Sequence, residues 1–309
     1  MTNLDQPLFD GADATKRDLV DYLDAVRDRV IPQLRDRPLS VLRVRPGQAP
    51  FMQKNMPKYT PEWLRTTPVW AEASRREITY GLCDDRRALL WFANQRAVEY
   101  HPTLYRMDAP DSQTHMVLDL DPPEGGPFSV VVRAAHLIRA ALAETNLAGA
   151  VKTSGAKGVH VFVPIKAGIA VADVAAATRA IAARAERIDP DAATTAYIRE
   201  DRQGKVFLDS TRSGGATVVA AYSPRIRPGS TVSFPVAWAD LDDVTPADFT
   251  VRTAIDLLST RDSWTKEMPE PQALADDLVA EGHTIPVARV AAMHEGKRRA
   301  RARRDAEAQ

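Results

Sequence analysis

Residues 115–123 read His115-Met116-Val117-Leu118-Asp119-Leu120-Asp121-Pro122-Pro123, an alternation of apolar and acidic side chains that two prolines bring to an end. A period of two residues predicts a β-strand, and the prolines stop it because they cannot donate to a ladder of hydrogen bonds. Leu118 and Leu120 would face a core, while Asp119 and Asp121 share the opposite face with Cα atoms roughly 6.5–7 Å apart. The segment therefore predicts two carboxylates side by side on one face of a sheet.

Neighbouring carboxylates repel each other unless a cation lies between them. Asp119 and Asp121 therefore predict a site for a hard divalent ion such as Mg²⁺ or Mn²⁺, which prefers oxygen ligands. Asp209 ends a second apolar strand, 206–209, and would add a third carboxylate if the two strands are neighbours. Three such carboxylates fit a two-metal phosphoryl-transfer site. The alternative is a solvated strand end, in which Asp before Pro-Pro makes a turn.

Helix signals and strand signals interleave along the rest of the chain. Thr15 and Asp18 predict a capping box before a helix whose apolar residues recur at helical spacing up to Leu34. A Pro-rich, irregular connection is expected over 46–68. Further helices are expected over 86–100, 128–142 and 174–188 and from Thr245-Pro246, and further strands over 158–165, 205–209 and 217–222. This interleaving predicts a fold of the α+β or α/β class.

A glycine-punctuated segment, Lys152-Thr153-Ser154-Gly155-Ala156-Lys157-Gly158-Val159-His160, leads into one of these strands. Its glycines would let backbone amides approach an anion, and Ser154, Lys157 and His160 would supply further donors. The spacing is not that of a Walker A loop. Arg225 and Arg227, farther along the chain, are further candidate phosphate ligands. The alternative is an ordinary turn and a strand edge with solvated side chains.

The composition limits the classes of function. The 309 residues hold 41 Lys and Arg against 41 Asp and Glu, so any basic surface must be local. The single cysteine, Cys83, excludes an internal disulfide framework and a cysteine-based zinc cluster. No apolar run approaches the ~18 residues of a membrane span, and the first residues lack the layout of a signal peptide. We expect a soluble, cytoplasmic protein.

Taken together, the motifs resemble the polymerase domain of bacterial DNA ligase D, in the archaeo-eukaryotic primase superfamily. They fall in the order of that family over about residues 3–262. The matching segments are Thr15-Lys16-x-Asp18-Leu19-Val20-Asp21-Tyr22, Phe51-Met52-Gln53-Lys54, Glu99-Tyr100-His101-Pro102, Val117-Leu118-Asp119-Leu120-Asp121-Pro122, Lys152-Thr153-Ser154-Gly155-x-Lys157-Gly158-x-His160, Val206-Phe207-x-Asp209 and Ala221-Tyr222-Ser223-x-Arg225.

The resemblance implies a primase-like core of two packed β-sheets flanked by helices. It also implies a nucleotidyltransferase that uses two Mn²⁺ ions, or Mg²⁺, and takes NTP or dNTP substrates. The catalytic residues and metal ligands would be Asp119, Asp121 and Asp209. The nucleotide would be held by His101, Ser154, Lys157, His160 and Arg225, with a base stacked on Phe51 and Met52. The DNA 5′-phosphate and backbone would be contacted by Lys16, Arg43 and Lys54.

Four departures from the family pattern bear on function. Gln6 follows Asn3 where the family has a lysine, which removes one cation from the 5′-phosphate pocket. Ser210-Thr211-Arg212 replaces a Gln-Asn pair after the third aspartate, and Met52 replaces a second aromatic residue. No Lys-x-Asp-Gly ligase nucleophile is present, so the chain is expected to be a stand-alone member similar to the actinobacterial Prim-PolC proteins.

The main hypothesis is a template-dependent polymerase that fills short DNA gaps in repair and prefers ribonucleotides. Its expected partners are gapped or broken DNA with a 5′-phosphate, NTPs, a Ku-like protein and a separate DNA ligase, and we expect a monomer associated with the nucleoid. One alternative is a non-catalytic module that holds DNA ends or gaps. A second is a phosphatase of the haloacid-dehalogenase type, against which Pro122-Pro123 stands in place of a small residue and a threonine.

The expected organisation is one catalytic domain over 1–265 and a helical, basic extension over 266–309. Six Lys and Arg residues between 297 and 304 would add nonspecific contacts to DNA phosphates. The alternative for them is a solvated tail.

Overall fold

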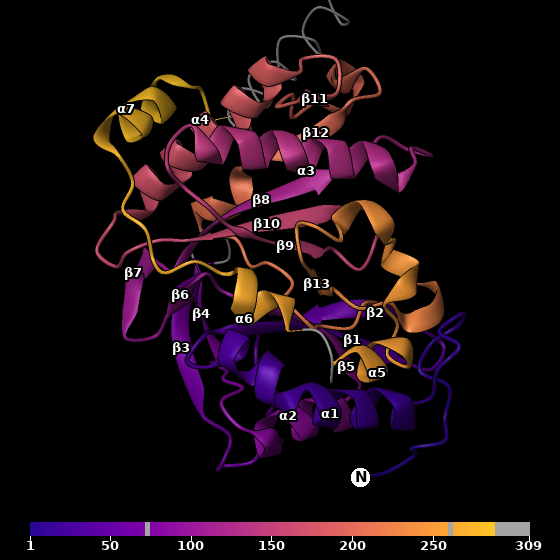
Figure 1. Ribbon diagram of the computed structural model, residues 1–309. Helices are drawn as coiled ribbons and strands as arrows, with labels where there is room; N and C mark the ends of the chain where they lie inside the picture. Colours follow the sequence, from indigo (N-terminus) through magenta and orange to yellow (C-terminus); the bar gives the residue numbers. More distant parts are fainter. Residues whose placement is uncertain (72–74, 259–261, 288–309) are drawn as a thin grey trace, which may run out of the picture.

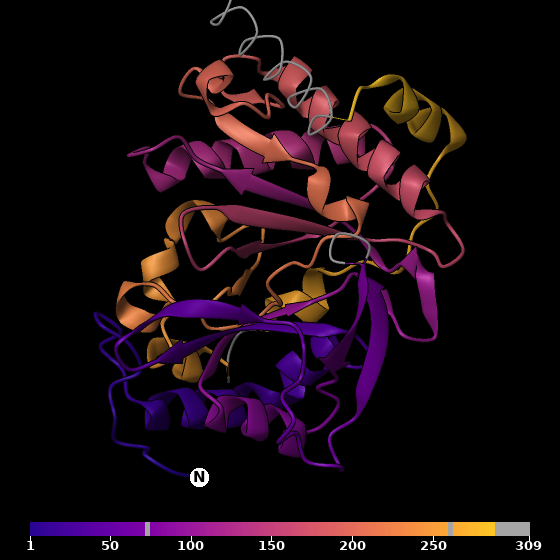
Figure 2. The same ribbon diagram turned by 180° about the vertical axis from the view of Figure 1, so that it is seen from behind.

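Two β-sheets lie face to face between two helical layers in the computed structural model (Figures 1 and 2). The structure describes residues 1–71, 75–258 and 262–287, and the basic segment 297–304 lies outside them. One outer layer holds α1 (Lys16–Leu34) and α2 (Arg86–Asn94), and the other holds α3 (Phe128–Ala143) and α4 (Val171–Ile188). The predicted α+β fold with two packed sheets is confirmed.

The first sheet is formed by residues from the amino-terminal third of the chain. Its order is β2-β1-β4-β3, and β5 pairs with the other side of β1. The strands are β1 (Leu39–Arg45), β2 (Gln48–Gln53), β3 (Thr66–Ala71), β4 (Arg76–Gly81) and β5 (Ala97–Pro102).

The second sheet carries the acidic segment at its centre. Its order is β11-β12-β8-β10-β9-β13, and β8 is antiparallel to both of its neighbours. The strands are β8 (His115–Asp121), β9 (Ala150–Thr153), β10 (Val159–Pro164), β11 (Ala193–Thr194), β12 (Val206–Asp209) and β13 (Pro235–Val236). A separate small hairpin joins β6 (Tyr105–Arg106) and β7 (Ala109–Gln113).

The two faces of β8 contribute to two different cores. Leu118 and Leu120 are fully buried in the core that α3 and α4 form with the second sheet. Val117 and, on β10, Phe162 belong instead to the core between the sheets, with residues of α1, β1 and β5. The alternation read from the sequence is confirmed, so Asp119 and Asp121 face the space between the sheets.

The helix α1 begins as predicted. Thr15 Oγ1 accepts a hydrogen bond from the Asp18 amide, and the Asp18 carboxylate accepts one from the Thr15 amide, so the capping box is complete. The helix continues through Pro32 to Leu34 and buries its apolar stripe against the first sheet.

Two expected elements of the first sheet are wrong. The irregular stretch 46–68 contains β2, because a turn at Gly47, with φ of +71°, folds 48–53 back onto β1. The helix expected over 86–100 ends at Asn94, and Arg96 turns the chain into β5, which pairs along β1. In both places pairing with β1 decides the structure, over the Pro-rich pattern at 46–68 and over the helical pattern after Asn94.

Two further expectations need correction. Residues 217–222 run beside β5 through Val218 N–H to Pro102 O and Ala220 N–H to Tyr100 O, but they form no regular strand. The helix expected from Thr245-Pro246 is a single 3₁₀ turn, Pro246–Asp248.

The described part of the expected extension is packed against the body. Short helices α5 (Thr253–Leu257) and α6 (Ser263–Glu267) precede α7 (Asp276–Thr284), and the expected boundary at 265 falls inside α6. The Glu281 carboxylate of α7 pairs with Arg184 of α4 at 2.6 Å, and Leu278 is buried in the core of the second sheet. Within the described residues, no helix has the length and apolar character needed to cross a bilayer.

Candidate active site

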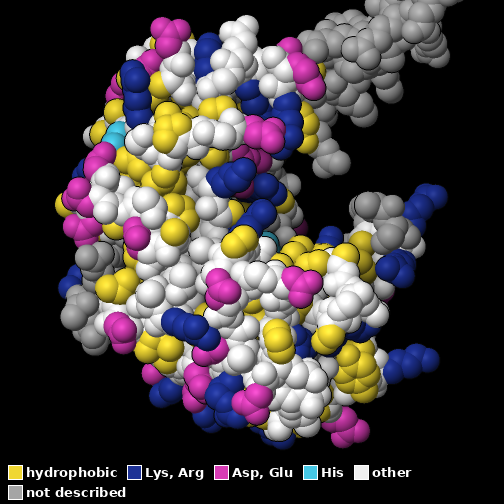
Figure 3. Space-filling view, turned by 90° about the vertical axis from the view of Figure 1, so that its right-hand side faces the viewer, with side chains coloured by type: hydrophobic (Ala, Val, Ile, Leu, Met, Phe, Trp, Pro, Cys, Tyr) yellow, Lys and Arg dark blue, Asp and Glu magenta, His cyan; other side chains and the backbone are white. Residues whose placement is uncertain are grey.

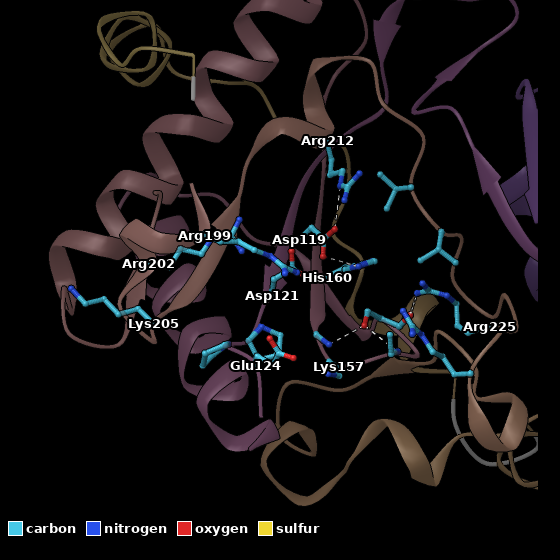
Figure 4. Close-up of a pocket in the computed structure, with 18 of the residues that line it drawn as sticks. Asp119, Asp121, Glu124, Lys157, His160, Arg199, Arg202, Lys205, Arg212 and Arg225 are labelled. Carbon is cyan, nitrogen blue, oxygen red and sulfur yellow. Dashed lines mark hydrogen bonds and ion pairs between the residues drawn. The ribbon is translucent and has the colours of Figure 1, made fainter. Parts of the chain in front are cut away.

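A cleft of about 740 Å³ opens between the two sheets. His101 of β5 lines it from the first sheet, and Asp119 and Asp121 of β8 line it from the second. Figure 3 shows the surface hollowed here, with Lys and Arg side chains gathered at the hollow, and Figure 4 shows the residues inside. The volume is that of an ordinary ligand site.

A row of polar side chains crosses the second sheet at one level. Asp209 of β12 lies directly opposite Asp119 of β8, which lies opposite His160 of β10, which lies opposite Lys152 of β9. Directly opposed residues on neighbouring strands have Cβ atoms about 4.5–5.5 Å apart. The strand adjacency on which the third carboxylate depended is therefore present.

The row is joined by hydrogen bonds. His160 Nε2 lies 3.0 Å from Asp119 Oδ1, and Lys152 Nζ lies 2.8 Å from His160 Nδ1 and 2.6 Å from Ser233 Oγ. Burial and the nearby Lys152 lower the pKa of His160 to about 4, so the ring is neutral at pH 7. With Lys152 donating to Nδ1, the ring proton is on Nε2 and is donated to Asp119.

The charges of the two β8 aspartates differ. Burial acts to raise the pKa of Asp119, but His160 and Arg212 outweigh it and hold that pKa below the usual range. Burial and the negative charges of Asp119 and Asp209 raise the pKa of Asp121 to about 6. The carboxylate of Asp121 is thus repelled by those of Asp119 and Asp209, and a bound cation would relieve this repulsion.

Arg212 takes the position of a counter-ion. Its Nε lies 3.1 Å from Asp119 Oδ2 and 3.5 Å from Asp209 Oδ2 (Figure 4). Asp209 Oδ1 accepts hydrogen bonds from the amide and the hydroxyl of Thr211, at 2.8 and 2.6 Å. Thr211 and Arg212 belong to the 3₁₀ turn Thr211–Gly214 that follows β12.

The donor set fits a divalent cation in chemistry, though not in its present arrangement. Three carboxylates on one face supply the hard oxygen ligands that Mg²⁺ and Mn²⁺ prefer. Among the described residues, however, no three His, Cys, Asp or Glu side chains converge as a ready cation site. The hydrogen bonds and ion pairs of Asp119 and Asp209 explain this, because donors already face their oxygens.

The glycine-punctuated segment is built differently from the sequence expectation. Ser154 Oγ accepts hydrogen bonds from the amides of Ala156 and Gly158, so these amides point into the loop and do not form an anion cradle. A Cβ at Gly158 would lie 2.2 Å from Leu120 O, so the glycine is needed for close approach to β8. The exposed Lys157 reaches the cleft (Figure 4).

Glu99 holds two of the predicted nucleotide ligands. Glu99 is 4% exposed, and its carboxylate lies 3.1 Å from Arg225 Nε and 2.9 Å from His101 Nε2 and accepts a 2.8 Å hydrogen bond from the Ile226 amide. Arg225 also donates to the Ser154 carbonyl. Burial acts to raise the pKa of Glu99, but His101 and Arg225 lower it to about 2. Glu99 is therefore an anion that positions both cleft residues.

Further cations line the cleft beside the acidic row. Arg199 and Arg202 come from the 3₁₀ turn Arg199–Arg202, and Lys205 follows it (Figure 4). With Lys157 and Arg225 they place cations around the two β8 aspartates, which suits a polyanionic ligand next to the carboxylates (Figure 4).

The predicted base-stacking residues lie elsewhere. Phe51 and Met52 are on β2 at an edge of the first sheet, and neither lines the cleft. The Arg45 guanidinium lies 4.7 Å from the centre of the Phe51 ring, and the Arg43 guanidinium lies 5.6 Å from it. Met52 is 43% exposed.

The predicted 5′-phosphate ligands are mostly engaged within the protein. Lys16 is 3% exposed, and its Nζ donates at 2.8 Å to both Thr2 O and Asn94 Oδ1. Arg43, 7% exposed, donates to Gln95 O at 2.7 Å and to Gln53 Oε1 at 2.6 Å. Lys54 is exposed, and none of the three lines the cleft.

The sequence interpretation gave no role to Glu99, Lys152 or Arg212, although each was within a quoted segment. Glu99 stands two residues before His101 on one strand face, which was a usable signal. Arg212 stands three residues after Asp209, so a tight helical turn brings it back over that carboxylate. The remaining cleft cations, Arg199, Arg202 and Lys205, had no motif to mark them.

Comparison with known proteins agrees with this geometry. A family model described as the LigD primase-polymerase domain matches residues 15–264. The multifunctional non-homologous end joining DNA repair protein LigD of Mycobacterium tuberculosis H37Rv is 32% identical over 254 residues, covering 79% of this chain and 33% of that protein. The bifunctional LigD of Bacillus subtilis 168 is 30% identical over 260 residues, covering 82% and 41%.

A solved structure is similar in fold over most of the chain. The polymerase domain from Mycobacterium tuberculosis ligase D in complex with DNA has a TM-score of 0.78 and 30% identity, with coverage of 87% of this chain and 98% of that one. The chain thus spans about the polymerase domain alone, and between a third and two fifths of these full-length relatives.

Proposed function

The chain belongs to the LigD primase-polymerase domain family, and on that premise we propose that it is a template-dependent nucleotidyltransferase that fills short gaps in DNA. One observation carries the proposal. Asp209 lies directly opposite Asp119 on the neighbouring strand, and Asp119 and Asp121 line a cleft that is also lined by lysine and arginine side chains. This is the arrangement required to bring a triphosphate next to metal-binding oxygens.

In the proposed reaction the cations that line the cleft bind the triphosphate. Lys157 and Arg225 would neutralise phosphate oxygens, and the Ser154 hydroxyl retains its own proton for donation because its oxygen accepts the loop amides. Glu99 would keep Arg225 and His101 in fixed positions, which limits the ordering needed when the nucleotide binds.

Asp119, Asp121 and Asp209 would hold two divalent ions, Mn²⁺ or Mg²⁺. When bound, such ions lower the pKa of a primer 3′-hydroxyl and stabilise the departing pyrophosphate. The hydrogen bond from the neutral His160 to Asp119 Oδ1 would fix the orientation of that carboxylate, with Lys152 fixing the ring in turn.

We also propose gapped or broken DNA as the substrate, and ribonucleotides as the preferred monomers. The relatives act, by their names, in non-homologous end joining, and the similar solved structure contains DNA. A Ku-like protein and a separate ligase are the partners proposed for such a pathway, and the nucleoid is the proposed location.

The test is primer extension on a duplex with a short gap, supplied with Mn²⁺ and either ribonucleotides or deoxyribonucleotides. We expect addition of a few nucleotides, faster with ribonucleotides, and a fall of about 10³-fold or more with Asp119→Ala, because residues that act as a unit lose most of the rate together. Asp242→Ala, which removes an exposed carboxylate on the far side of α3, is the matched control and should extend normally. Equal extension by Asp119→Ala and the wild-type protein would refute the site, and retained gap binding without any extension would favour an end-holding module.

A further inference from the structure

Arg212 is the residue whose position the proposed chemistry leaves unexplained. It lies in the cleft with its guanidinium directed at the acidic row, and its Nε is within 3.5 Å of oxygens of both Asp119 and Asp209. A phosphate ligand would be expected to face the cleft opening with the other cations. Arg212 instead faces the carboxylates (Figure 4).

The donors around these two aspartates account for all four carboxylate oxygens. Asp119 Oδ1 faces His160, and Asp209 Oδ1 faces the amide and hydroxyl of Thr211. The remaining oxygen of each aspartate, Oδ2, faces Arg212. A divalent ion that bridges these two Oδ2 atoms would occupy the place of the Arg212 Nε.

We propose that Arg212 is a tethered counter-cation that competes with the divalent metal for Asp119 and Asp209. The proposal rests on the proposed function, because it concerns the same carboxylates. A guanidinium and a divalent ion a few ångströms apart repel each other strongly in a partly buried site. Metal binding therefore disfavours the present position of Arg212, and the present position of Arg212 disfavours metal binding.

Arg212 can leave the acidic row, and the phosphates of a bound nucleotide would be its new partners. Its side chain is 38% exposed, whereas the side chains of Asp119 and Asp209 are 12% and 8% exposed. Released from the carboxylates, the guanidinium stays in the cleft with Arg225, where a triphosphate would offer it bidentate acceptors. Arg212 would then couple the two binding events. The metal displaces the Arg212 side chain from the aspartates, and the nucleotide gives that side chain new partners.

The test measures Mn²⁺ affinity of the full chain without nucleotide or DNA, from the electron paramagnetic resonance signal of free Mn²⁺. Arg212→Gln should lower the dissociation constant by about five- to a hundredfold, the usual range for coupled sites. Arg199→Gln removes a positive charge from the same cleft, and among the described residues Arg199 forms no ion pair with the three aspartates. It should change the constant by less than about threefold. Asp121→Asn should weaken binding and so identify the site that is titrated.

A crystal structure with Mn²⁺ supplies a readout that does not depend on net charge. Arg212 Nε should move beyond hydrogen-bond distance of both Asp119 and Asp209. Equal Mn²⁺ affinity of wild type and Arg212→Gln, or Mn²⁺ on both aspartates with Arg212 still in contact, overturns the Arg212 proposal and leaves the polymerase proposal standing. Binding of Mn²⁺ by neither protein overturns both.

Discussion

The predicted cationic ligands differ in exposure between the two halves of the molecule. Beside the second sheet, the exposed Lys157 lines an open cleft next to the acidic row. On the first sheet, Lys16 and Arg43 are buried and already donate to protein oxygens. A cation whose donors are satisfied inside the fold has little left to offer a phosphate, because binding must first break those bonds. Matching residue types alone cannot separate the two cases.

The strongest test of the cleft half is to loosen its cations without removing them. Glu99→Gln keeps the shape of the side chain but removes the charge that holds Arg225 and His101. We expect kcat/KM for the nucleotide to fall by about 10- to 100-fold, mainly through KM, as is typical when a supporting partner is lost. Steady-state extension over a nucleotide series measures it.

The matched control for this change is Glu281→Gln. Glu281 also pairs with two arginines, Arg184 and Arg187, but on α7, on the far side of the second sheet from the cleft. It should leave KM unchanged. A normal KM in Glu99→Gln would show that Arg225 and His101 do not need Glu99 for their position.

The first half is tested by Lys16→Met. Because Lys16 Nζ bonds to Thr2 O and Asn94 Oδ1, the change should lower the free energy of unfolding by about 1–3 kcal/mol. For the wild-type protein we expect the rates of extension on gaps with a 5′-phosphate and with a 5′-hydroxyl to agree within about threefold. Lys16→Met should leave the ratio of these two rates unchanged. Denaturant unfolding and paired gap substrates measure the two effects.

Lys54→Met is the comparison variant, since Lys54 is exposed and should not affect stability. A large preference for the 5′-phosphate that disappears in Lys16→Met would mean that Lys16 leaves its internal partners to bind DNA. The contrast between the two halves would then be lost.

The smallest expected effect concerns Asp121, whose pKa is raised to about 6 in the folded protein. A raised carboxyl pKa means that the folded state binds the proton more tightly than the unfolded state, so stability falls as the pH rises from about 4 to 6. Asp121→Asn removes this loss. Without metal, at pH 7–8, we expect it to be more stable than wild type by at most about 1 kcal/mol, because Asp121 lies exposed at the strand end and solvent screens its charge.

Thermal unfolding in a chelator, from pH 4 to pH 8, measures that difference. The difference in stability between Asp121→Asn and the wild-type protein should vanish toward pH 4 and be constant above pH 7. A difference in stability that does not depend on pH would mean that the repulsion among the three aspartates is already neutralised. Arg212 would then screen Asp121 as well.

The apolar pattern allowed prediction of helices with one buried face and of strands that are buried along most of their length. The helices α1, α3 and α4 and the strands β8, β10 and β12 have clear apolar patterns, and all are present. The strands of the first sheet were missed because β2, β3 and β4 are partly exposed, and because β5 follows a helix and pairs with β1 from more than 50 residues away. β2, for example, alternates only weakly in burial and is identified by its register with β1.

The site shows the same division. The carboxylates of Asp119 and Asp121 could be placed together from the period of one strand, and Asp209 was a candidate as the end of a second apolar strand, whose adjacency the structure supplies. Two features needed three-dimensional information: the partners of Lys16, one of which is 78 residues away at Asn94, and the turn that directs Arg212 at the row. Both decide which groups are free to bind a ligand.

The row across the second sheet has a consequence for synthesis of the protein. Lys152, His160, Asp119 and Asp209 come from four strands, and the row is complete only after residue 209 has been made and β12 has paired with β8. A nascent chain that stops earlier holds two of the three aspartates but no completed site. Ligand binding would therefore stabilise only the finished fold, and the growing polypeptide on the ribosome would remain catalytically silent until its last central strand is in place.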